Sequence, residues 1–212
     1  MRRSAALLLL AGGLLSLGGG ETPAQGGADA FLRVDLRVGG RITEILTPDL
    51  DGDGRHDLLV VRGREALTFR QNADGSWPAA PQQRFRFHPR TVLFDVADLD
   101  GDGRAEIALL QKKGVFAYRL KERGGQLLYG LRPEKVVLCD NFFKRPVRKE
   151  VRRKQFLRDV DQDGDVDLVL PRQNGFSILR NEGPGYTLDL VASMQSPWFR
   201  GVEVVGNDSG TP

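Results

Sequence analysis

The sequence predicts an all-β fold made of three blade-like, four-stranded units. One observation is an acidic motif, D-x-D-x-D-G-x-x-D/E, that recurs from Asp49, Asp98 and Asp159. A second is the apolar run of strand length that follows each copy, and a third is the series of glycine-rich turns between such runs. Repeats of about 50 residues with four short strands are typical of β-propeller blades, which need neighbours to bury their faces.

Residues 1–30 are expected to be a secretory signal peptide. Arg2 and Arg3 form a basic start, an apolar stretch follows, and small residues around Ala24 and Ala30 offer alternative cleavage sites. The apolar stretch is shorter than the roughly 18 residues that a membrane anchor needs. We therefore expect a secreted, periplasmic or cell-surface protein with no transmembrane segment after signal removal.

The repeat region is expected to span residues 31–212. Each unit should begin with a strand that enters the acidic loop, continue with the apolar strand after the loop, and close with two more strands joined by turns. The units are expected at 41–88, 90–139 and 154–191, with fourth strands at 84–88, 126–131 and 186–191 and entering strands at 41–46, 91–97 and 154–160. Residues 31–38 predict an additional strand, and 199–212 resemble the start of a degenerate fourth unit.

The acidic loops predict about three calcium sites. Alternate residues of a loop that curls around an ion point their carboxylates at one centre, and the glycine at position six permits the sharp turn. Ca²⁺ prefers about six to eight oxygen ligands. The expected ligands are positions one, three, five, seven (through its carbonyl) and nine, namely Asp49, Asp51, Asp53, Arg55, Asp57, Asp98, Asp100, Asp102, Arg104, Glu106, Asp159, Asp161, Asp163, Asp165 and Asp167.

Other interpretations of the loops are weaker. Zinc is disfavoured because no Cys or His lies at ligand spacing, whereas magnesium is an alternative that resists an all-protein cage. An EF-hand needs a glutamate at position twelve, where this chain has Val60, Leu109 and Leu170. A solvated acidic turn without metal is the simplest alternative, and three copies with the same acids and glycine argue against it.

These features resemble the FG-GAP-like, or VCBS-type, repeat family, whose calcium-binding blades also build the propeller of integrin α-subunits. The matching segments are DLDGDGRHDLLV with ALTFRQNADGSW, DLDGDGRAEIAL with VFAYRL, and DVDQDGDVDLVL with FSILRNEGPG. The resemblance covers residues 41–191. It implies β-propeller blades, an extracellular setting and a largely structural role for Ca²⁺, and it supplies no ligand and no enzymatic activity.

The number of units raises the question of how such a propeller is completed. Propellers of this family usually have about seven blades, whereas three units are recognisable here. We expect the chain to be part of a larger, about seven-bladed propeller, and assembly with another copy is the alternative. An isolated arc of three blades would leave open edges and apolar faces.

A basic segment, Lys144–Lys154, lengthens the connection before the third acidic loop. Its cations are Lys144, Arg145, Arg148, Lys149, Arg152, Arg153 and Lys154. One interpretation is a loop that binds an anionic polymer, and the other is a solvated loop between units that offsets nearby acids. Specific nucleic-acid binding is not expected, because no aromatic residues are interleaved with these cations.

No feature of the sequence predicts catalysis. His56 and His88 have no convincing Ser or Cys partner, and the single Cys139 allows no internal disulfide. The first hypothesis is therefore a secreted, calcium-binding, non-enzymatic scaffold for adhesion or for recognition of an unknown protein or glycan. The second is the scaffold portion of a secreted enzyme whose catalytic part lies outside this chain.

Overall fold

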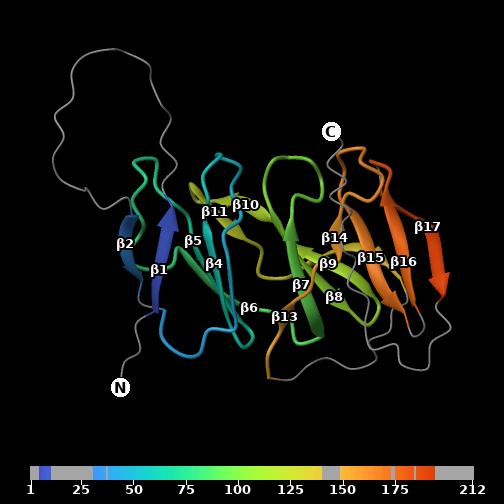
Figure 1. Ribbon diagram of the computed structural model, residues 1–212, viewed down its shortest axis with the longest axis horizontal. Coiled ribbons are helices and arrows are strands. Elements are labelled where there is room, and N and C mark those ends of the chain that lie inside the picture. Colours follow the sequence, from blue (N-terminus) through green and yellow to red (C-terminus); the bar gives the residue numbers. More distant parts are fainter. Residues whose placement is uncertain are drawn as a thin grey trace, which may run out of the picture.

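The computed structural model describes residues 5–10, 31–36, 38–139, 149–172, 175–183 and 185–193. These residues form strands, turns and loops and contain no helix, so the all-β prediction is confirmed for them. No described segment has the helical length and hydropathy needed to cross a membrane. Three sheets of sequential antiparallel strands follow one another along the long axis of the molecule (Figure 1).

Each of the three sheets contains four antiparallel strands in chain order, and the second sheet has a fifth strand at its edge. The first has β3 (Glu44–Leu46), β4 (Leu58–Arg62), β5 (Glu65–Phe69) and β6 (Gln83–Arg86). The second has β7 (Thr91–Ala97), β8 (Glu106–Gln111), β9 (Gly114–Tyr118) and β12 (Glu134–Leu138). The third has β14 (Leu157–Arg158), β15 (Asp167–Arg172), β16 (Gly175–Asn181) and β17 (Tyr186–Ser193). This is the strand order expected of propeller blades.

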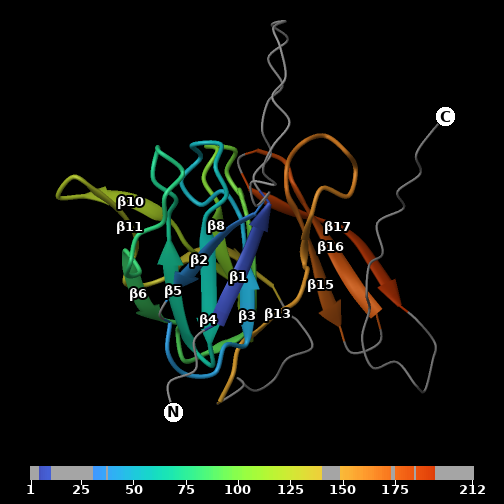
Figure 2. The same cartoon turned by 60° about the vertical axis from the view of Figure 1, so that its left-hand side comes forward.

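The fourth strand of the second sheet was predicted at 126–131, and this prediction is wrong. That segment instead forms β11 (Gln126–Tyr129), which pairs with β10 (Leu120–Arg123) in a separate hairpin. Gly124 and Gly125 form its turn with φ values of 58° and 75°, which only glycine adopts readily. Figure 2 shows the hairpin projecting from the side of the stack.

The segment before the third sheet also differs from expectation. The predicted entering strand at 154–160 is reduced to the two residues of β14. Just before it, β13 (Arg152–Arg153) runs parallel to β7 and extends the second sheet at its edge. The carboxylate of Asp95 fixes this crossing, because it accepts hydrogen bonds from Arg153 Nε at 2.8 Å and from the Phe156 backbone N–H at 3.0 Å.

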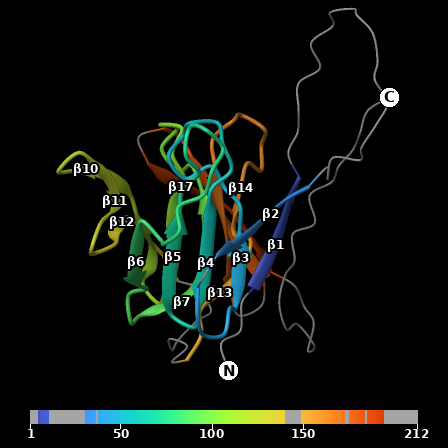
Figure 3. The same ribbon diagram turned by 90° about the vertical axis from the view of Figure 1, so that its left-hand side faces the viewer.

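A small additional sheet covers the outer side of the first sheet. Its strands are β1 (Ala5–Leu10) and β2 (Phe31–Leu36), which pair antiparallel. Figure 3 shows both strands in front of the stack when it is viewed from the first sheet. Leu36 and Val38 pack there against apolar residues of β4 and β5. Most of the predicted signal peptide and the predicted degenerate unit at 199–212 lie outside the described residues.

Strands β4 and β8 contribute to two cores each, because successive residues of a strand point to opposite faces. In β4, Leu59 faces the second sheet and Leu58 faces β2. In β8, Leu109 packs toward the first sheet and Leu110 toward the third. This explains why the runs after the acidic loops are apolar throughout instead of alternating.

Candidate metal centres

The three acidic loops lie in a row at the same end of the stack, the upper edge in Figure 1. In each loop three carboxylates gather, so that one oxygen from each lies within 4.8 Å of the others. We call these groups the carboxylate trios. They are Asp49, Asp51 and Asp53; Asp98, Asp100 and Glu106; and Asp159, Asp161 and Asp167. The first trio uses loop position five and the other two use position nine, so each predicted ligand set is brought together in part.

The aspartate at position one organises the backbone of each loop. Asp49 accepts hydrogen bonds from the N–H of Gly52 at 2.8 Å and of Gly54 at 2.7 Å. Asp98 and Asp159 accept the equivalent pairs in the second and third loops. The glycines at position six have φ values of 81°, 84° and 97°, as the predicted turn requires.

The position-five and position-seven residues form a local turn in each loop. The carboxylates of Asp53, Asp102 and Asp163 accept hydrogen bonds from the backbone N–H groups of Arg55, Arg104 and Asp165, respectively, at 2.8–2.9 Å. The Arg55 side chain additionally pairs with Asp53. The position-seven residues were predicted as ligands through their carbonyl groups, and that role stays a prediction.

The acids at position nine are buried and join each loop to its sheet. Asp57 and Asp167 are 0% exposed. One oxygen of Asp167 accepts the Val160 N–H at the loop entrance and the other accepts the Asn181 N–H at the end of β16, both at 2.9 Å. In the first loop Asp57 accepts the equivalent hydrogen bonds from the N–H groups of Leu50 and Gln71. Sequence reasoning assigned these acids only as ligands and missed this connection.

The electrostatics of the metal-free loops are unfavourable. Burial raises the pKa of Asp57 to about 6 and that of Glu106 to about 7, although backbone hydrogen bonds oppose the shift. Burial and then the neighbouring Asp53 charge raise the pKa of Asp51. Asp51 Oδ1 is buried and has no hydrogen-bond partner in the described structure. A hard cation fits this oxygen-rich site, because it would bond to that oxygen and offset the acidic charge.

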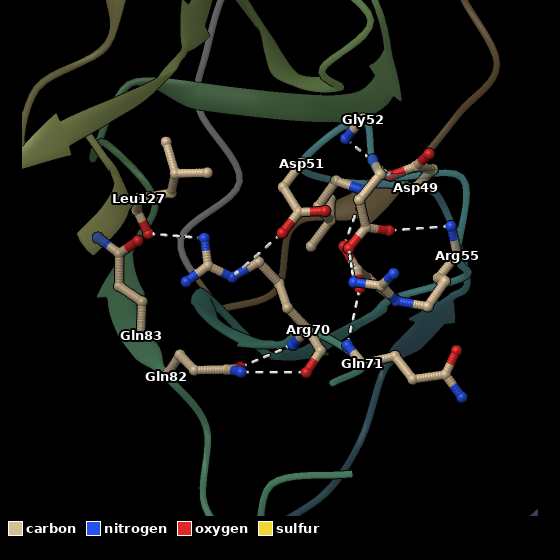
Figure 4. Close-up of polar contacts among 12 residues, drawn as sticks. Asp49, Asp51, Gly52, Arg55, Arg70, Gln71, Gln82, Gln83 and Leu127 are labelled. Carbon is tan, nitrogen blue, oxygen red and sulfur yellow. Dashed lines mark hydrogen bonds and ion pairs between the residues drawn. The ribbon is translucent and has the colours of Figure 1, made fainter. Parts of the chain in front are cut away.

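An arginine lies beside each trio, and sequence reasoning missed all three. Arg70, Arg119 and Arg180 each stand nineteen residues after the position-three aspartate of their loop, at the end of the third strand. Figure 4 shows Arg70 directed toward Asp51, with Nε 3.8 Å from Oδ2. The constant spacing is the sequence signal that could have identified them.

Comparison with known proteins matches part of this region to a family. Residues 49–109 match the model described as FG-GAP-like repeat. No curated protein matches the chain. Among solved structures, the Photorhabdus luminescens Tc holotoxin pore with the mutation TccC3-D651A is 20% identical, with a TM-score of 0.41. The match covers 68% of this chain and 7% of that chain, so this chain spans a small part of the toxin chain's length.

Proposed function

Because residues 49–109 form an FG-GAP-like repeat within a stack of four-stranded sheets, we propose that this protein is a calcium-binding, non-enzymatic scaffold of the β-propeller kind. The observation that carries the proposal is the recurrence of a carboxylate trio at the same place in all three loops. Calcium at these trios supplies positive charge that holds the carboxylates together.

The position of the loops explains why calcium would matter for the scaffold. Leu50, next to the first position-one aspartate, is 0% exposed in the core between the first and second sheets. Its carbonyl accepts the Ala105 N–H at 3.3 Å, which links the first loop to the second. Leu99 occupies the equivalent place between the second and third sheets. An ordered loop therefore contributes to the packing of one sheet on the next.

Calorimetry and thermal melts test the proposal. Protein stripped with chelator should take up Ca²⁺, and at 100 times Kd each independent site should add about 2.7 kcal/mol to the free energy of unfolding. Asp51→Ala, Asp100→Ala and Asp161→Ala should each remove part of that gain. Absence of calcium heat together with identical melts in calcium and chelator would rule the proposal out.

The proposed setting is outside the cytoplasm, with a protein or glycan as partner in adhesion or recognition. An anionic polymer bound through the basic segment is the narrower version of this idea. Within the described part of that segment, Arg152 pairs with Glu150 and Arg153 pairs with Asp95. Charge reversal at Lys149 and Arg152, with Arg153 left intact because it holds the fold, should weaken retention on an anionic resin. Unchanged retention would remove the polymer from consideration.

A further inference from the structure

The three arginines beside the loops repeat as regularly as the acids do. Arg180 Nη1 lies 2.9 Å from Asp161 Oδ2, and Arg119 Nη1 forms an ion pair with Asp100 Oδ2. Each contact is made to the aspartate at position three, the central member of its trio. The guanidinium therefore pairs with a carboxylate that would also be a ligand of a bound metal ion.

Each guanidinium is held in place by a second contact outside its loop. Arg70 Nη1 donates to the Leu127 carbonyl of β11 at 2.9 Å, which Figure 4 shows. Arg119 Nε lies 3.8 Å from Glu134 Oε2 on β12, and Arg180 Nε lies 3.0 Å from Asp189 Oδ2 on β17. The arginines thus connect the loops to neighbouring strands and are not free to leave without losing these contacts.

The second loop shows the conflict with a metal ion most directly. Arg119 Nη1 is 3.6 Å from Glu106 Oε1 as well as paired with Asp100, so it contacts two of the three carboxylates in that trio. An oxygen that accepts a guanidinium N–H is less available to an ion, and the two positive charges repel each other. The same guanidinium lowers the repulsion among the acids when no ion is bound.

We propose that Arg70, Arg119 and Arg180 are built-in counter-ions, which keep the loops folded without calcium and lower the loops' affinity for it. The inference rests on the proposed calcium function and assigns the residues that regulate it. The acidic carboxylates then have a positive charge beside them with or without calcium, because the guanidinium remains when Ca²⁺ leaves. Loss of calcium therefore need not unfold the three sheets.

Calcium titration of a triple variant tests this directly. In Arg70→Gln/Arg119→Gln/Arg180→Gln, the mean calcium affinity measured by calorimetry should rise about tenfold, the effect of a unit charge removed from a few ångströms away. The same variant should melt at a lower temperature than the parent in chelator. A purely structural role would lower the melting temperature without raising the affinity.

A control variant with the same change in net charge separates the effect of an arginine close to the loop from the effect of net charge. Arg84→Gln/Arg90→Gln/Arg132→Gln removes the same number of cations, and Arg84 pairs with Glu65, away from the trios. This control should bind calcium as the parent does. If the loop-arginine variant matches the control in affinity, the inference is overturned and the calcium proposal stands.

Two further outcomes are informative. If the parent takes up no calcium but the loop-arginine variant does, the counter-ion inference holds and the proposed function of the parent fails; if neither binds, both fail. If the triple variant does not fold in chelator, Arg180→Gln alone serves, because Arg180 is the most exposed of the three side chains. Its affinity must then exceed that of Arg84→Gln, or the inference is rejected.

Discussion

Replacement of Asp167 by alanine tests whether the buried acid at position nine stabilises the sheet independently of any metal. Asp167 is 0% exposed, and its two oxygens accept the N–H groups of Val160 and Asn181 at 2.9 Å. Asp167→Ala removes both acceptors and leaves two donors without partners. Stability should therefore fall even in chelator.

The expected loss follows from the number and kind of these hydrogen bonds. A hydrogen bond to a charged group contributes about 1.5–3 kcal/mol, so two such bonds predict a loss of about 3–6 kcal/mol in the free energy of unfolding. This is a large share of the roughly 5–15 kcal/mol that keeps a typical domain folded. Asp167→Asn should lose less, because its amide oxygen still accepts one of the two bonds.

Urea denaturation in chelator is the appropriate assay, with Asp163→Ala as the matched control. Asp163 belongs to the same loop, is exposed, and accepts only the local Asp165 N–H among the contacts found in the described residues. Its replacement should change metal-free stability by less than about 1 kcal/mol. If Asp167→Ala and Asp163→Ala unfold at the same urea concentration, the structural role given to position nine is wrong.

Three other predictions concern pH, site order and strand contact. Because the pKa values of Asp57 and Glu106 are raised on folding, the folded state holds these protons more tightly and metal-free stability should fall as pH rises from about 4 to about 7; chelator melts that rise over this range would contradict it. Within its nine residues, 159–167, the third loop has five acids and no arginine, whereas the first two loops each contain one, so Asp161→Asn should eliminate the tightest calcium-binding phase in calorimetry, and retention of that phase would refute the charge argument. Gly114→Ala should destabilise the protein by more than about 1 kcal/mol in urea, since its Cβ would lie 2.1 Å from the Val137 carbonyl at a φ of 144°; a neutral effect would argue against the β9–β12 pairing.

Local signals in the sequence were sufficient for the acidic loops and the inner strands of each repeat. The loop glycines, the apolar runs and the spacing between them predicted the inner strands of all three sheets. The fourth strand of the second sheet was mispredicted because two segments, 126–131 and 134–138, both have the composition of a strand. The folded structure shows that 134–138 pairs with β9, with Lys135 opposite Phe116 and Leu138 opposite Gly114.

The candidate sites were predictable in composition and less so in detail. Acid spacing identified the loops, yet it could not show that Asp167 turns inward to backbone N–H groups. That choice depends on burial, which is a property of the assembled sheets. The arginines were missed because they follow the loops at a distance along the chain, and only folding of the third strand brings Arg180 back to Asp161.

The residue at position two shows how the metal sites and the packing of the sheets depend on each other. Leu50 and Leu99 are buried where one sheet meets the next, whereas Val160 in the third loop is 37% exposed. Calcium in the first two loops would therefore order a side chain that contributes to a core between sheets. Burial of a leucine side chain contributes about 1.5–3 kcal/mol to the free energy of unfolding. In the third loop it would order only that loop and its own sheet within the described structure. Removal of calcium should accordingly loosen the contacts between sheets before it affects the hydrogen bonds within them.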